Sequence, residues 1–397
     1  MTSSLSPSAM VDRAMSRTGL FDLGDTHFQP TLESWCADLD SAPLTEGGQQ
    51  QLARQAERNL HTRLGIIDVI KRNPEIHEVK LPRIVRIMGF PRSGTTLLHN
   101  LMGRQVDARS LLRWELTAPL PPPEAATHST DPRIGSTQRV VETLRGSELE
   151  RMHWVEAQDP EECTWGFFDL SGLMGRSCVN LMSNWTKAIF PGHPRRQTYQ
   201  EYRSLVQLLL WQNPLPPGGV LVLKCPTDVD QAATFLDTFP EAGLVLCHRD
   251  PYRTLTSTCH LQAAAQEAWT DGTQEPDRDD HNMSLQTQAL FAEAMVAVSA
   301  SHPDRVANVH YPDLMSDPAG AVVGAYAELD VDPGAELASG VRDFIDRQRA
   351  GGRATPPDRY GSYGYDRTSV WDNRAMSRYV HHFGITPEAV RITQTEG

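Results

Sequence analysis

The sequence predicts an α/β fold in which helices flank a P-loop-like parallel β-sheet. Short apolar runs recur along the chain, and stretches with helical periodicity follow them, as in βα units. Several of these runs end at a cation or a glycine-bounded turn, where open parallel sheets hold ligands. We expect one structural unit made of a helical N-terminal extension (1–80), an α/β domain (81–350) with a helical insertion at about 134–215, and a C-terminal lid and helix (351–397).

Composition narrows the functional classes. The 397 residues carry a formal net charge of −13, which argues against nucleic-acid binding through a basic surface. No apolar stretch approaches the roughly 18 residues of a membrane span, and no signal-peptide pattern opens the chain. The six cysteines are scattered without a C-x-x-C pair, which indicates reduced thiols. We therefore expect a cytoplasmic protein with no membrane or nucleic-acid partner; nothing in the sequence indicates an oligomeric state.

The N-terminal region predicts two helices that pack on the core. One is short and lies near residues 8–18, and irregular chain follows it to about residue 30. The second covers about 47–72, where apolar side chains recur with helical spacing at Leu52, Ala56, Leu60, Leu64 and Ile67.

The stretch RIVRIMGFPRSGTTLLHNLM, residues 83–102, predicts a strand, a tight turn and a helix. The apolar run 84–88 is the strand, and the helix begins at Thr95. Gly89 and Gly94 lie five residues apart, as in the nucleotide-binding motif G-x-x-x-x-G-K-[ST], but Thr95 replaces its lysine. The N–H groups at the start of such a helix, together with the helix dipole, favour a bound phosphate or sulfate.

A cation lies inside this loop, at Arg92. Its planar guanidinium suits the paired oxygens of a phosphate or sulfate ester. The segment PRSGTT resembles the 5′-phosphosulfate loop of sulfotransferases that use 3′-phosphoadenosine 5′-phosphosulfate (PAPS). Its arginine form is similar to the branch of tyrosylprotein sulfotransferases and many bacterial small-molecule sulfotransferases, whereas cytosolic animal enzymes usually carry lysine there. The resemblance implies a PAPS-binding loop made of Pro91, Arg92, Ser93, Gly94, Thr95 and Thr96.

Glu115 is the candidate general base. It lies between Trp114 and Leu116, and apolar surroundings raise the pKa of a carboxyl group. A salt-bridged surface glutamate is the alternative on sequence alone. In tyrosylprotein sulfotransferases and related bacterial enzymes, the base is a glutamate a little over twenty residues after the loop cation. Glu115 follows Arg92 by 23 residues, so the resemblance implies this role for it.

The insertion at 134–215 is rich in aromatic and methionine side chains, which suits an apolar acceptor pocket as well as ordinary core packing. Its PEEC segment resembles a recurring element of the bacterial branch. We interpret Glu161 and Glu162 as helix-start residues, because acidic groups are favoured near the positive end of the helix dipole. His153 is a reserve candidate for the base.

The segment VLVLKCP contains a second buried strand, 220–223, with Lys224 at its carboxyl end. A solvated lysine is the alternative interpretation. In the resembling family the Lys-x-Pro position stabilises the transferring sulfuryl group, which implies that role for Lys224. A histidine often follows in the bacterial branch, but Thr227 and Asp228 stand here, which favours Glu115 over a histidine as the base.

A helix at 231–239 and a third strand at 244–247 follow, and the strand ends in His-Arg-Asp-Pro. Arg249 and Ser257 lie eight residues apart, which resembles the family's clamp for the 3′-phosphate of PAPS. A structural Arg–Asp pair is the alternative. Farther on, the sequence predicts a strand at 305–310, a helix through 329 and a last helix near 371–383. The family's C-terminal Arg-Lys-Gly segment is absent; Arg353 in the expected lid is the open candidate to replace it.

Together these features predict transfer of a sulfuryl group from PAPS to a hydroxyl of a small, partly apolar acceptor, such as a phenol or a secondary metabolite. A sugar, a peptide tyrosine or a carrier-bound substrate is the alternative acceptor. Adenosine 3′,5′-bisphosphate is the product, and no metal is expected because no metal-binding motif is present. Arg92, Lys224 and Glu115 are the candidate catalytic residues. A P-loop kinase using Mg-ATP is one alternative, disfavoured by the missing loop lysine. A catalytically inactive nucleotide-binding homologue is the other.

Overall fold

A computed structural model describes residues 5–173, 181–190, 195–267, 269–271, 278–350 and 363–388. It contains a five-stranded, all-parallel sheet with the strand order β2-β3-β1-β4-β5. The predicted α/β fold with a parallel sheet is therefore confirmed. The strands are β1 (Arg83–Gly89), β2 (Ala108–Ser110), β3 (Val220–Lys224), β4 (Ala242–His248) and β5 (Val306–His310).

The strand order brings the carboxyl ends of the central strands to one edge of the sheet. In the parallel register, Ile87 of β1 lies opposite Lys224 of β3, and Gly89 of β1 lies opposite Cys247 of β4. The chain passes from β1 to β2 on one side and later to β4 and β5 on the other. Such a switch point opens a crevice beyond the strand ends, where ligands bind in open α/β sheets.

Two apolar layers bury the two faces of the sheet. Val85 and Ile87 point to one face, where they pack with α4 (Thr95–Met102), α14 (Pro318–Glu328) and α15 (Leu337–Ala350). The alternate strand positions point to the other face and join a larger cluster. This cluster also contains residues of the N-terminal helices and of α9 (Arg196–Trp211), α10 (Ala232–Thr238) and α12 (Arg278–Ser301). Burial on both faces explains why these strands read as near-continuous apolar runs.

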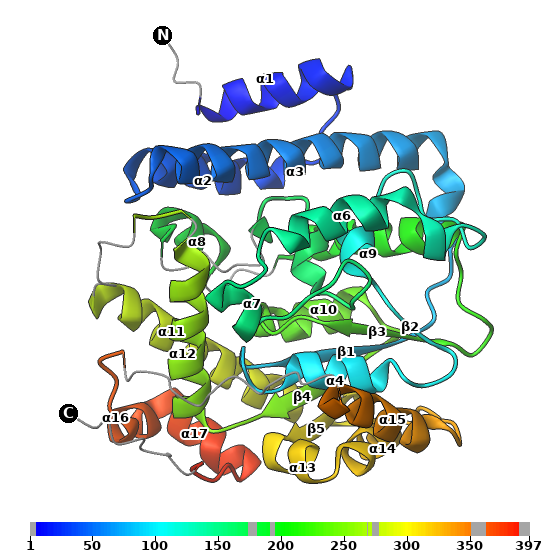
Figure 1. Ribbon diagram of the computed structural model, residues 1–397, viewed down its shortest axis with the longest axis vertical. Coiled ribbons are helices and arrows are strands. Elements are labelled where there is room, and N and C mark those ends of the chain that lie inside the picture. The colour runs from blue at the N-terminus through cyan, green and yellow to red at the C-terminus, as the bar shows by residue number, and fades with distance from the viewer. Residues whose placement is uncertain are drawn as a thin grey trace.

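The N-terminal extension forms a helical layer over this second face, drawn in blue at the top of Figure 1. It consists of α1 (Pro7–Thr18), α2 (Gln29–Ser41) and α3 (Glu46–Arg72). The side chain of Arg63 on α3 forms an ion pair of 2.5 Å with Glu201 on α9 and so ties the layer to the body. The predicted helices at 8–18 and 47–72 are confirmed, whereas α2 falls partly on chain that we expected to be irregular or left unassigned.

The remaining helices surround the sheet (Figure 1). The insertion supplies α6 to α9, as predicted, and helices after β3 and β5 match the expected βα pattern. The bounds are α5 (Arg113–Thr117), α6 (Pro132–Glu142), α7 (Glu148–Met152), α8 (Ser183–Ile189), α9 (Arg196–Trp211), α10 (Ala232–Thr238), α11 (Pro251–Gln266), α12 (Arg278–Ser301), α13 (Tyr311–Ser316), α16 (Arg367–Asp372) and α17 (Arg374–Phe383).

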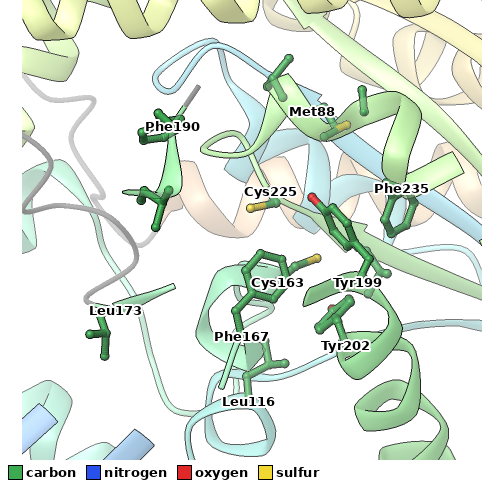
Figure 2. Close-up of a cluster of buried hydrophobic side chains, with 14 of the residues drawn as sticks. Met88, Leu116, Cys163, Phe167, Leu173, Phe190, Tyr199, Tyr202, Cys225 and Phe235 are labelled. Atoms are coloured by element: carbon green, nitrogen blue, oxygen red, sulfur yellow. The ribbon is translucent and has the colours of Figure 1, made fainter. Parts of the chain in front are cut away.

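Figure 2 shows a core rich in aromatic and sulfur-containing side chains, which residues of the insertion form together with residues such as Met88 and Cys225. The Phe167 ring packs edge-on against Tyr199 and Tyr202 of α9, with centroid separations of 5.7 and 5.2 Å. The five described cysteines are all buried and free, as expected for reduced thiols. No helix in the described part of the chain is long and apolar enough to cross a membrane. Arg353 and most of the expected lid lie outside the described residues.

Candidate active site

The turn between β1 and α4 depends on two glycines. Gly89 has φ 144°, and a Cβ there would lie 2.5 Å from the carbonyl oxygen of Cys247. Gly94 has φ 95° at the N-cap of α4, and a Cβ there would lie 2.9 Å from the Tyr311 ring. Only glycine tolerates both the positive φ and the close approach. The glycines that the sequence singled out therefore shape this turn, residues 89–94, which we call the cradle.

Arg92 adopts an unusual backbone conformation in this cradle, with φ 70°. A left-handed conformation costs a non-glycine residue about 1–2 kcal/mol and is often found at functional sites. The Arg92 Nε donates a hydrogen bond of 3.1 Å to the Ser257 hydroxyl, and an Nη donates to the Met152 carbonyl oxygen at 2.9 Å. The Arg92 carbonyl oxygen in turn accepts a hydrogen bond of 3.0 Å from Arg249. The structure thus brings together Arg92, Arg249 and Ser257.

The rest of the loop divides into structural and cavity-facing residues. The Ser93 hydroxyl is buried and donates to the carbonyl oxygen of Phe90 at 2.7 Å, so it closes the turn. Pro91, Thr95 and Thr96 line a cavity beside the loop. The first N–H groups of α4 have no partner within the helix, and no side chain caps them. They are available to an anion at this end of the cavity.

Lys224 reaches the same place from the end of β3. Its Nζ lies 3.5 Å from the Thr96 hydroxyl and 2.9 Å from a carboxylate oxygen of Glu162. The Lys224 side chain is only 1% exposed. Burial opposes its charge, but the carboxylates of Glu162 and Glu161 outweigh burial and hold the pKa of Lys224 above its usual value. The amine is therefore a fixed positive charge next to the start of α4.

The interpretation of Glu161 and Glu162 as helix-start residues is correct for their position, because Glu162 is the N-cap of a short 3₁₀ helix, Cys163–Gly166, but the capping role is not found. Glu162 precedes a short 3₁₀ turn, but its side chain makes no capping hydrogen bond there and pairs with Lys224 instead. Glu161 accepts a hydrogen bond of 2.7 Å from Arg113, and His153 lies 3.9 Å from the same oxygen. Burial would raise the pKa of Glu161, but His153, Arg113 and Lys224 hold it well below the usual range. Glu162 lines the cavity, whereas Glu161 is not among its lining residues.

Glu115 lies in a different environment from the one we expected. Its carboxylate is fully buried and accepts hydrogen bonds from Arg109 at 2.6 Å, from His128 at 3.0 Å and from the N–H of Leu112 at 2.9 Å. Burial opposes its charge, but these three partners outweigh burial and lower the pKa of Glu115, against the expected rise. Glu115 is also not among the residues that line the cavity. Its role as the base stays a prediction.

Arg249 points its guanidinium at a carboxylate from the C-terminal segment. Its Nε and one Nη contact the two oxygens of Glu388 at 2.7 and 2.9 Å. The N–H of Glu388 donates to Asp250 at 2.9 Å, and Arg367 donates to the Glu388 carbonyl oxygen at 2.8 Å. The Arg249 guanidinium also lies 3.8 Å from the centroid of the Tyr311 ring. A paired anion therefore already occupies the fork of Arg249.

The cavity beside the loop has a volume of about 870 Å³. Arg92, Thr96, Glu162 and His153 give it a polar end, and α3, α11 and α12 supply much of the remaining wall. The insertion contributes to this wall, as predicted, but so does the N-terminal extension. Among the described residues, no group of three His, Cys, Asp or Glu side chains is arranged to hold a metal ion. The apolar side chains of the wall include Leu149, Trp165, Phe168, Leu173, Phe190, Trp269 and Phe291.

A family model described as the sulfotransferase family matches residues 82–333, which is more than half of the chain. The chain belongs to the sulfotransferase family. The matched region of this family member contains the cradle, Glu162, Lys224 and the Arg249–Ser257 pair. It excludes α1 to α3, so the part of the cavity wall that α3 supplies lies outside the region that the family model describes.

Two mycobacterial proteins are similar to this sulfotransferase family member. It is 26% identical over 260 residues to proteins from Mycobacterium bovis and Mycobacterium tuberculosis named omega-hydroxy-beta-dihydromenaquinone-9 sulfotransferase Stf3. The match covers 61% of this chain and 61% of each relative.

Two crystal structures share the fold. Sulfotransferase STF9 from Mycobacterium avium matches with a TM-score of 0.86 and 23% identity, over 98% of this chain and 100% of that one. Sulfotransferase STF1 from Mycobacterium tuberculosis H37Rv matches with a TM-score of 0.77 and 22% identity, over 94% of this chain and 98% of that one. The agreement extends over the N-terminal helices as well as the sheet.

Proposed function

We propose that this protein transfers a sulfuryl group from PAPS to a hydroxyl group of a small, partly apolar acceptor. The observation that carries the proposal is the convergence of three cations from three strand ends. Arg92 and Arg249 are in contact, and Lys224 reaches Thr96, four residues from Arg92. An acidic protein, with a net charge of −13, gathers these cations where a helix start already favours anions. A doubly phosphorylated nucleotide matches this arrangement, and membership of the sulfotransferase family supports it.

The proposed roles follow from position. The N–H groups of Thr95 and Thr96 hold the 5′-phosphosulfate, while Arg249 and Ser257 hold the 3′-phosphate. Arg92 and Lys224 stabilise the charge that grows on the sulfate and leaving-group oxygens. These groups are fixed before the reaction by hydrogen bonds and burial, so little reorganisation is needed during transfer.

The base that we propose is Glu162 rather than Glu115. Glu162 lines the cavity and contacts Lys224, so it faces the region where the acceptor hydroxyl would meet the sulfur atom. The acceptor oxygen forms a bond to sulfur as the bond between sulfur and the 5′-phosphate oxygen breaks, in line, as in phosphoryl transfer. Glu162 takes the acceptor proton, and adenosine 3′,5′-bisphosphate leaves. This step requires only the two substrates.

The acceptor that the cavity favours is a hydroxylated molecule with an apolar body. Aromatic and aliphatic side chains form much of the wall, and polar side chains lie both at the loop end and along α3, such as Gln55 and Asn59. The name of the mycobacterial relative Stf3 states that it acts on an omega-hydroxylated menaquinone. That acceptor has the same general character, a hydroxyl group on a largely apolar molecule.

Calorimetry and a transfer assay test the proposal. We expect adenosine 3′,5′-bisphosphate to bind the wild-type protein without a metal, whereas a kinase would require Mg-ATP. Incubation with PAPS and a panel of phenols and alcohols should then give sulfated product. Binding of Mg-ATP without bisphosphate would contradict the proposal. Bisphosphate binding without transfer to any acceptor would favour a catalytically inactive homologue.

A further inference from the structure

A second cavity, of about 250 Å³, lies between α3 and α9, beside the acceptor cavity. Phe168 lines both cavities. Its neighbour Phe167 is anchored in the aromatic core against Tyr199 and Tyr202 (Figure 2), so the backbone of this wall is held in place. The half-buried side chain of Phe168 therefore belongs to the walls of both cavities. Rotation of this side chain would change how widely the two cavities connect.

The charged groups of the second cavity are paired with one another or with their neighbours. Arg63 forms a two-pronged ion pair with Glu201, at 2.5 Å for each contact. Asp169 accepts hydrogen bonds from the hydroxyls of Ser171, at 2.6 Å, and Thr198, at 2.5 Å. Because these charges are satisfied, they offer little to an ionic ligand. An uncharged, apolar occupant is the chemistry that fits.

The apolar lining comes largely from one face of α3, with Ile66, Ile67 and Ile70, together with Phe167 and Leu205. A concave surface lined by apolar side chains is typical of a ligand site. The same helix also forms part of the acceptor cavity through residues such as Asn59 and Thr62. A single elongated ligand could therefore lie along α3 and occupy both spaces.

We propose that the second cavity receives the distal, uncharged end of a long-chain acceptor, and that Phe168 sets the chain length that the protein admits. This inference rests on the proposed function, because it assumes that the hydroxyl end lies in the first cavity near Glu162. It locates selectivity for chain length on α3 and at Phe168. Since α3 precedes the region matched by the family model, relatives with a different N-terminal helix would differ in this selectivity.

Binding of straight-chain alcohols tests this role of Phe168. The affinities of 1-octanol, 1-decanol, 1-dodecanol and 1-tetradecanol are measured by displacement of the fluorescent probe N-phenyl-1-naphthylamine. Each buried methylene group should strengthen binding about fourfold until the accessible space is filled. Phe168→Ala should extend this rise to longer alcohols, and Phe168→Trp should end it earlier. An unchanged chain-length profile in both variants, or no alcohol binding to the wild type, would overturn the proposal.

Ile70→Phe is the matched control, because Ile70 lines only the second cavity. We expect it to cancel the gain of Phe168→Ala for the longest alcohols and to leave 1-octanol binding unchanged. An equal loss for 1-octanol would show that the chain does not extend into the second cavity and would contradict the proposal. Thermal unfolding establishes that each variant is folded. Calorimetry with adenosine 3′,5′-bisphosphate and the PAPS transfer assay separate the two hypotheses, because failure of the proposed function would appear in those measurements and not in the chain-length profile.

Discussion

The acid–base chemistry of the site depends on which carboxylate meets the acceptor, the buried Glu115 or the half-buried Glu162. Glu115 has three hydrogen-bond partners and lies outside the cavity lining, whereas Glu162 lines the cavity beside Lys224. A buried carboxylate with an established set of donors stabilises the fold, and a carboxylate at a cavity wall can exchange a proton with a ligand. The two glutamates therefore have different expected phenotypes.

We predict that Glu162→Gln lowers kcat by about a hundredfold or more, because general bases contribute on that order. Glu115→Gln should retain most of kcat but destabilise the protein by about 3 kcal/mol, since it weakens a buried ion pair with Arg109. Transfer assays and denaturant unfolding on both variants measure the two effects. Bisphosphate binding to Glu162→Gln is the control for an intact site. The opposite pattern, with Glu115→Gln inactive and stable, would restore Glu115 as the base.

Two anions compete for the same guanidinium donors of Arg249. Glu388 occupies them through two contacts, and a 3′-phosphate would require the same donors. We predict that Glu388→Gln strengthens binding of adenosine 3′,5′-bisphosphate about tenfold, whereas Arg249→Ala weakens it severely. Calorimetry measures both effects. Glu336→Gln, at an exposed position, controls for the change in net charge. Weaker binding by Glu388→Gln would instead mean that Glu388 holds Arg249 in its binding position.

At the scale of elements, sequence patterns located the strands and turns that carry local signals. A few neighbouring residues are enough to predict the turn glycines, Gly89 and Gly94, and the apolar runs of β1, β3 and β4. The candidate cations follow where these strands end. The partner of Lys224 could not be predicted from the sequence, because Glu162 lies 62 residues away in the chain and only the tertiary structure brings the two side chains together. One signal could have suggested it, since a buried lysine requires a carboxylate.

Among the elements that escaped prediction, β2 and α2 did so for separate physical reasons. Strand β2 has three residues, Ala108–Ser110, which is too short for an apolar run and depends on pairing with β3. Helix α2 carries an apolar stripe at Leu32, Trp35, Cys36 and Leu39, which is visible in the sequence as helical spacing. Pro30 at its first turn looks like a breaker, although proline is favoured at that position of a helix.

The docking of α3 gives a prediction with a matched control. A Cβ at Gly48 would lie 2.3 Å from the carbonyl oxygen of Trp269, whereas a Cβ at Gly47 would meet nothing within 4 Å. Gly48→Ala should therefore lower the free energy of unfolding by about 1–3 kcal/mol, because backbone must move. Gly47→Ala, in the same helical turn, should leave stability unchanged or raise it slightly. Thermal and denaturant unfolding measure both, and equal effects would contradict this packing.

At the scale of the whole molecule, buried neutral histidines make stability depend on pH. His99 donates to the Val222 carbonyl oxygen at 3.1 Å, and His248 contacts Asn308 at 2.9 Å. Burial, the largest cause in each case, lowers the pKa of both histidines to about 3. The unfolded chain therefore binds more protons than the folded protein between about pH 6.5 and pH 3. The stability that these neutral histidines contribute is fully present above pH 6.5 and is lost as the pH falls through this window.

We predict that the free energy of unfolding falls below pH 6.5 by about 1.4 kcal/mol per pH unit for each of these histidines. Denaturant unfolding at a series of pH values gives the slope. His248→Gln should reduce the slope by about one proton, whatever its effect on stability at neutral pH. A free energy that stays constant from neutral pH to about pH 5 would contradict the assignment of neutral histidines.

The central claim is that Arg92, Lys224 and Arg249, brought together from three strand ends, surround one nucleotide. The most direct measurement is a crystal structure of the protein with adenosine 3′,5′-bisphosphate. The predicted result places the 5′-phosphate on the N–H groups at the start of α4 and the 3′-phosphate on Arg249 and Ser257, with Glu388 displaced. A nucleotide bound elsewhere, with the contact between Arg249 and Glu388 intact, would contradict it.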